Sequence, residues 1–113
     1  MSRIVFTDLA NDDLDDIYVT IAPDNEAAAN RIIDEIHELT LKLTKFPLMG
    51  RAADELKPGA RVFVLRKYLL IYRPMNYGIA VLRIAHGARD LLALEYPPAP
   101  AEEGDDPHDL ALI

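Results

Sequence analysis

The sequence of 113 residues predicts an α+β fold of order β-α-α-β-β-β, with an N-terminal helical hairpin packed on a small, mainly antiparallel sheet. Two observations predict the hairpin. Apolar residues recur at helical spacing in two segments, and only Pro23, Asp24 and Asn25 connect them. A third observation predicts the sheet, because three β-rich runs with short connections follow residue 60.

The first half of the chain contains one predicted strand and both helices. Residues 3–6 form a short apolar segment, and Thr7 then offers an N-cap for a helix that ends at residue 21. The apolar side of this helix consists of Ala10, Leu14, Ile17, Tyr18 and Ile21. The second helix, over residues 25–46, has an apolar stripe of Ile32, Ile36, Leu39, Leu43 and Phe46, and Pro47 ends it.

The second half of the chain supplies the rest of the sheet. Residues 47–60 are predicted to be a loop with one helical turn. Gly78 suits a turn that needs positive φ, and we expect the N-terminal strand to join one edge of the sheet. Residues 89–95 are predicted to form a last helical turn. The predicted strands are residues 61–66, 68–74 and 79–86.

Both faces of this predicted sheet are apolar. Tyr68, Leu70 and Tyr72 point to one face, whereas Leu69 and Ile71 point to the other. One helical layer can cover only one of them, so either the C-terminal tail folds back or another chain covers the second face. Because a large exposed apolar patch usually marks an interaction site, we expect an obligate or near-obligate partner.

Charge is distributed very unevenly along the chain. Residues 1–41, 42–95 and 96–113 carry net charges of −8, +6 and −5, which makes the total −7. We assign residues 1–95 to the folded domain and residues 96–113 to an acidic, Pro-rich tail that is mostly disordered. The tail is either a solubilising extension or, in a second hypothesis, docks weakly on the domain through Leu110–Ile113.

Several functional classes are disfavoured. The chain has no cysteine, which excludes disulfides and thiolate metal sites. The N-terminus does not resemble a signal peptide and no apolar run has the length of a membrane span, so we expect a soluble, cytoplasmic protein. We predict no metal site, because four aspartates fan around the first helix and are interpreted as a solvated face: Asp12, Asp13, Asp15 and Asp16.

Five short motifs occur in a fixed order along the chain. They are Asp13-Leu14 with Ile17-Tyr18, Pro47-x-x-Gly50-Arg51, Leu56-x-x-Gly59-x-Arg61, Tyr68 to Arg73, and His86-Gly87-x-Arg89-Asp90. In their order and spacing, residues 3–95 resemble the RelE/ParE toxin superfamily, and the ParE branch most of all. The tail lies outside this resemblance.

The resemblance implies the toxin of a bacterial type II toxin–antitoxin module. ParE-like toxins are associated with poisoning of DNA gyrase, and a ParD-like antitoxin neutralises them by laying its C-terminal segment along the toxin. We therefore expect a non-enzymatic toxin with gyrase as its target and a ParD-like antitoxin as its partner. No cofactor and no sequence-specific binding of nucleic acid are expected.

RelE-like relatives instead cut messenger RNA in the ribosomal A site, and fold alone does not separate the two branches. Those nucleases carry an arginine where this chain has Leu69, another where it has Gly87, and often a C-terminal tyrosine where it has Ala93. A shifted alignment would bring in His86 or Arg89. The ribosome-dependent nuclease is therefore retained as the alternative, and an inert binding module is a third possibility.

Two sets of candidate site residues follow. The hypothesis for target binding takes the basic residues of the sheet region, namely Arg61, Arg66, Lys67, Arg73, Arg83, His86 and Arg89. The hypothesis for antitoxin binding takes Leu14, Ile17, Tyr18, Ile21, Tyr68, Leu70 and Tyr72. A basic rim around an apolar face would suit an acidic amphipathic peptide. The alternatives are core or interface packing for the tyrosines, protection against edge-to-edge aggregation for the cations, and a hydrogen bond to a loop carbonyl for His86.

Overall fold

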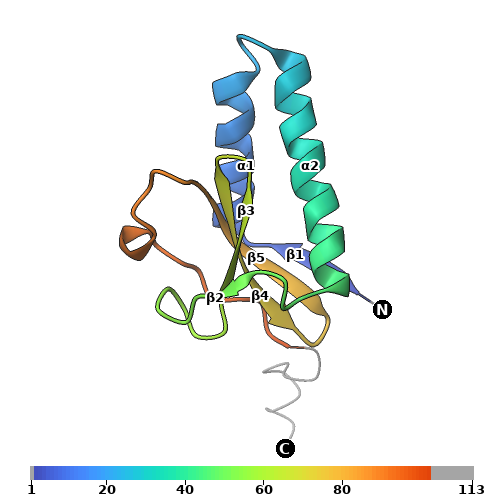
Figure 1. Cartoon of the computed structure of the whole chain (residues 1–113), viewed down its shortest axis with the longest axis vertical. Coiled ribbons are helices and arrows are strands. Elements are labelled where there is room, and N and C mark those ends of the chain that lie inside the picture. Colours follow the sequence, from blue (N-terminus) through green and yellow to red (C-terminus); the bar gives the residue numbers. More distant parts are fainter. Residues whose placement is uncertain (1, 103–113) are drawn as a thin grey trace, which may run out of the picture.

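The computed structural model describes residues 2–102 and confirms the predicted α+β fold (Figure 1). The elements are β1 (Arg3–Phe6), α1 (Asp8–Ile21), α2 (Glu26–Lys45), β2 (Arg51–Ala52), β3 (Arg61–Leu65), β4 (Tyr68–Met75), β5 (Gly78–His86) and a 3-10 turn (Leu91–Ala93). The sheet order is β1-β5-β4-β3-β2. The two helices stand side by side, and their connected ends project well beyond the sheet (Figure 1).

The ends of the helices follow the capping signals of the sequence. Thr7 Oγ1 accepts a hydrogen bond from the amide of Ala10 at 3.1 Å, and Asn25 Oδ1 accepts one from Ala28 at 3.0 Å. Both side chains thus satisfy amides that have no partner inside their helix. Among residues 2–102 we find no helix with the length and apolarity needed to cross a bilayer.

The sheet is mixed, because its first strand is parallel to its last. β1 pairs with β5 in parallel at the edge of the sheet, from Arg3 opposite Gly78 to Phe6 opposite Val81. The other pairs are antiparallel. The short strand β2 was not predicted, since two residues have no detectable period; it pairs Arg51 with Val62 at the far edge.

One core lies between the sheet and the helices. Among its most deeply buried side chains are Ile36, Leu43, Leu70, Tyr72, Ile79 and Val81. The predicted apolar stripe of α2 supplies three core positions, Ile36, Leu39 and Leu43, which confirms that this helix faces the sheet. Phe46, the last member of that stripe, lies beyond the helix and is exposed.

A second core lies on the opposite face of the sheet. Its buried members include Val62, Ile71, Ala80, Leu82 and Ala85, and the partly buried residues packed on them include Leu56, Leu91, Leu94, Tyr96 and Ala99. Because the chain itself covers this face, the expectation that a partner must cover it is wrong. The alternative, in which the C-terminal part folds back, is correct.

We call residues 94–102 the strap. Tyr77 donates a hydrogen bond from Oη to the carbonyl of Pro100 at 3.2 Å, and the amide of Asn76 donates to Glu102 Oε2 at 2.5 Å. Residues 96–102, which the sequence analysis placed in the tail, therefore contact the sheet. The predicted disorder of the later tail and the hypothesis on Leu110–Ile113 concern residues outside the described part of the chain.

Candidate functional site

An apolar groove lies where the projecting helices meet the β3–β4 hairpin. We call it the hairpin groove; it has a volume of about 400 Å³ and is lined by Ile21, Ala28, Ile32, Arg66, Lys67 and Tyr68. Aliphatic side chains from both helices form its walls, and the two cations come from the turn between β3 and β4. The groove therefore combines an apolar lining with positive charge.

Arg66 is held in place by its backbone and by an ion pair. It has φ of 56°, the left-handed conformation that lets two residues connect β3 and β4. Its guanidinium donates from Nε and Nη2 to the carboxylate of Glu35 on α2, at 2.6 and 2.7 Å. This hydrogen bonding lowers the pKa of Glu35. Since the pair is exposed to water, it orients Arg66 and adds little stability.

A second, more polar cavity of about 250 Å³ lies between α1 and the end of β5. Asp13, Asp16 and Thr20 line it from α1, Arg83 and His86 from β5, and Arg89 from the segment after β5. Opposite charges thus face each other across this cavity. A bare polyanion would meet both attractive and repulsive groups there.

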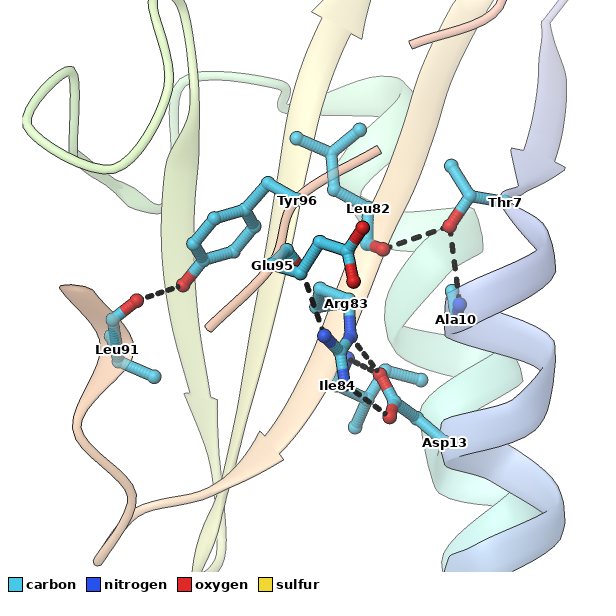
Figure 2. Close-up of polar contacts among 9 residues, drawn as sticks. All are labelled: Thr7, Ala10, Asp13, Leu82, Arg83, Ile84, Leu91, Glu95 and Tyr96. Carbon is cyan, nitrogen blue, oxygen red and sulfur yellow. Dashed lines mark hydrogen bonds and ion pairs between the residues drawn. The ribbon is translucent and has the colours of Figure 1, made fainter. Parts of the chain in front are cut away.

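Asp13 and Arg83 form the most extensive polar contact beside this cavity (Figure 2). Arg83 donates from Nε and Nη2 to the two carboxylate oxygens of Asp13, at 2.8 and 2.9 Å. The amide of Ile84 also donates to Asp13 Oδ2, at 2.8 Å. The side chains of Asp13 and Arg83 are only 11% and 14% exposed, and the hydrogen bond to Asp13 raises the pKa of Arg83.

This contact has a structural cause in the sheet. β1 pairs with β5 only as far as Val81, so the next residues of β5 have no neighbouring strand on that side. Thr7 Oγ1 donates to the carbonyl of Leu82 at 2.8 Å, while Asp13 accepts the amide of Ile84 (Figure 2). Side chains from the start of α1 thus satisfy backbone groups that a longer β1 would have paired.

A β-bulge brings Arg83 to this position. Ile71 pairs with Arg83 but Tyr72 pairs with Val81, so Leu82 is an extra residue in β5. Beyond the bulge the side chains change faces: Leu82 enters the second core and Ile84 the core under the helices. Arg83 Nη1 additionally donates to the carbonyl of Glu95 at 2.8 Å, which ties the strap to α1 (Figure 2).

The predicted basic residues do not form one rim. One group lies at the end of the sheet near the hairpin groove and consists of Arg66, Lys67, His86 and Arg89. The segment after β5 meets the β3–β4 turn there, because the amide of Gly87 donates to the carbonyl of Lys67. Arg61 and Arg73 lie towards the opposite end, since Arg61 pairs with Tyr72 and Arg73 with Ala80.

Several of these cations are already engaged in the fold. Arg61 donates to the carbonyls of Leu48 and Gly50, at 3.3 and 2.7 Å. Arg83 is largely buried and paired with Asp13, so it is not an exposed cation available to a large partner. His86 is exposed at the end of β5, and its Nδ1 accepts the amide of Ala88, so its partner here is a loop amide and not the loop carbonyl considered as the alternative.

The residues predicted for antitoxin binding divide in a similar way. Tyr68 and Ile21 line the hairpin groove, and Leu14 and Tyr18 are half-buried on α1. Leu70 and Tyr72, at 1% and 0% exposure, are core residues beneath the helices and so are not part of the surface. Ile17 is also a core residue, although it lines the polar cavity.

Sequence reasoning missed Ala28 and Ile32 of the groove, and it misplaced Asp13. The interpretation of Asp13 as part of a solvated face is wrong, because this aspartate is buried and paired. A signal was available: Asp13 lies three residues after Ala10 and four before Ile17, on the apolar side of the helix.

Comparisons with known proteins agree with this architecture. The model of the family described as ParE toxin of type II toxin-antitoxin system, parDE, matches residues 4–91. The chain is 29% identical over 94 residues to Toxin ParE3 of Caulobacter vibrioides, covering 82% of this chain and 94% of that toxin. The strap lies beyond the end of the family match.

A solved structure, described as the chromosomal ParDE TA system from P. aeruginosa, is also similar. It has a TM-score of 0.64 and 25% sequence identity, and the match covers 76% of this chain and 96% of that one. With a family match over most of the chain and a similar overall fold, this protein belongs to the ParE toxin family of type II toxin–antitoxin systems.

Proposed function

We propose that this toxin acts without catalysis, by binding DNA gyrase, and that a ParD-like antitoxin neutralises it from the hairpin groove. The shape and charge of the hairpin groove support the second part of this proposal, the binding of the antitoxin. Its apolar walls would bury the apolar side of an amphipathic segment, while Arg66 and Lys67 would orient the acidic residues of that segment.

The environment of the cations supports binding over catalysis. A metal-free ribonuclease needs unpaired cations and a proton-transfer group around the reacting phosphate. Here Arg61 and Arg83 donate to groups of the fold itself. The positions where RelE-like nucleases carry reactive side chains hold Leu69, Gly87 and Ala93.

A second candidate function is ribosome-dependent cleavage of messenger RNA. One observation favours it: His86 and Arg89 line the same polar cavity as Arg83. Together they provide a titratable ring and cations within one small cavity.

One experiment separates the two functions. The chain is induced alone in cells, and chromosomal DNA and messenger RNA are examined at the same time point. For gyrase poisoning we expect double-strand breaks, an SOS response and, in vitro, cleaved DNA trapped by purified gyrase with the purified chain. Cleavage of messenger RNA at A-site codons with intact DNA would establish the nuclease instead.

The groove assignment predicts a specific loss of antitoxin binding. Ala28→Glu places a carboxylate among the apolar groove residues and opposite the acidic segment, so we expect the Kd for the antitoxin to rise about 100-fold, equivalent to about 3 kcal/mol. The measurement is calorimetry or surface plasmon resonance with the purified pair.

The matched control is Ala27→Glu, which adds the same charge to the same helical turn at an exposed position outside the groove. We expect less than a threefold change in the Kd for this variant. Equal effects of the two substitutions would show that added charge matters and that the groove does not bind the antitoxin.

A further inference from the structure

The loop after α2 is held by side chains of the sheet. We call residues 46–50 the pinned loop. Tyr72 donates from Oη to the carbonyl of Pro47 at 2.7 Å and accepts the amide of Gly50 at 2.9 Å. Arg61 donates to the carbonyl of Gly50 at 2.7 Å. A Cβ at Gly50 would lie 2.7 Å from Tyr72 Oη, so the close approach itself requires glycine.

This firmly held loop nevertheless exposes two large apolar side chains. Phe46 is 59% exposed and Leu48 is 68% exposed. Two exposed cations, Lys42 and Lys45, precede them in the last turn of α2. A rigid surface of this kind binds a partner at little cost in conformational entropy, because its backbone is already ordered. The four side chains are called the loop surface.

The strap brings the rest of the chain close to the loop surface. Its last residue, Glu102, accepts the amide of Asn76, which directly follows β4. Tyr72, which holds the pinned loop, lies four residues earlier in that strand, or about 13 Å away. In Figure 1 the last described residues lie at the same end of the molecule as the C-terminal end of α2.

The length of the remaining chain distinguishes the loop surface from the hairpin groove. Residues 103–109 span at most about 24 Å when fully extended, which exceeds the 13 Å along the strand. The groove begins at Tyr68, eight strand residues from Asn76, or about 26 Å before that passage is added. Leu110, the first of the apolar residues, therefore reaches the loop surface without full extension of the segment, whereas only the last residues of a nearly extended segment would reach the groove.

The chemistry of this segment complements the loop surface. Its first part carries four carboxylates, on Glu103, Asp105, Asp106 and Asp109, and its second part is Leu-Ala-Leu-Ile. We propose that residues 103–113 dock in cis on the loop surface, with carboxylates near Lys42 and Lys45 and the apolar residues over Phe46 and Leu48. A tethered segment has an effective concentration in the millimolar range, so even a weak contact is occupied.

Paramagnetic relaxation tests this proposal on the full chain. Because the sequence has no cysteine, Ala111→Cys provides a unique site for a nitroxide label. We expect the amide signals of Phe46 and Leu48 to lose more than half their intensity, while those of Ala28 and Ile32 in the groove keep theirs. No broadening at the loop, or broadening at the groove, would overturn the proposal.

A mixing experiment distinguishes docking in cis from docking on a second copy. Chain that carries the nitroxide but no nitrogen-15 is mixed with chain that carries nitrogen-15 but no nitroxide. Docking in cis predicts no broadening in this sample, whereas broadening at the loop would assign the segment to a second copy and contradict the proposal.

Two variants test the contact itself. Phe46→Ser combined with Leu48→Ser should abolish the broadening of the loop amides, since both side chains that receive the apolar residues are removed. Val19→Ser is the control, because Val19 has similar exposure, 63%, and lies on α1. Far-ultraviolet circular dichroism and the Tm establish that each variant is folded. Retained broadening in the folded double variant would contradict the proposed contact.

Discussion

Asp13→Ala should lower the free energy of unfolding by about 3 kcal/mol, as expected when one partner of a buried ion pair is removed. The substitution leaves the largely buried guanidinium of Arg83 without its carboxylate and leaves the amide of Ile84 without an acceptor. Both groups were desolvated on folding and regain no partner in the variant. The measurement is equilibrium unfolding in urea, with the slope m compared between proteins.

The adjacent Asp12→Ala is the matched control, because Asp12 is exposed on the same helix. We expect a change within about 0.5 kcal/mol for this variant. The double variant Asp13→Ala/Arg83→Ala should be more stable than the sum of the single losses implies, since no unpaired charge remains buried. Equal losses for Asp12 and Asp13 would show that the loss reflects total charge and not the contact with Arg83.

Removal of the strap should destabilise the protein by a similar amount or more. A chain ending at Ala93 loses Leu94, Tyr96 and Ala99, which pack on the second core. Burial of one large apolar side chain contributes about 1.5–3 kcal/mol, so the partly buried set should contribute about 3–5 kcal/mol. Exposure of the sheet face beneath should also increase binding of the dye ANS and self-association, both of which are directly measurable.

The matched control for this truncation ends at Glu102. It removes the rest of the acidic segment but keeps the strap with its contacts to Tyr77 and Asn76. We expect it to resemble the full chain in ANS binding and to be only slightly less stable. Should both truncations behave alike, the strap would have no part in covering the second face.

The sequence was informative where local pattern and local chemistry determine structure. The spacing of apolar residues in α2 predicted its buried side, and Thr7 and Asn25 predicted where the helices begin. These features depend on residues three or four positions apart, which a single sequence displays directly. The β-rich runs after residue 60 likewise predicted β3, β4 and β5, and the apolar composition of residues 3–6 predicted β1.

Features that depend on distant residues were missed. The register shift that re-aims Arg83 depends on how β5 pairs with β4, and the burial of Asp13 depends on β1 ending early beside β5. Proline-rich acidic composition is typical of disorder, which concealed that Tyr96 and Ala99 would cover a sheet face. The hairpin groove was only partly predicted. Ala28 and Ile32 line it because the helices extend past the sheet, and that depends on the packing of distant elements.

The parallel pairing of β1 with β5 has a consequence for synthesis on the ribosome. Arg3 finds its partner only when Gly78 has emerged, so the whole intervening chain must be translated first. At about 5–20 residues per second, this delay lasts on the order of several seconds. Throughout that interval the nascent helices lack the sheet they pack on, so the domain cannot complete its fold until β5 has been translated.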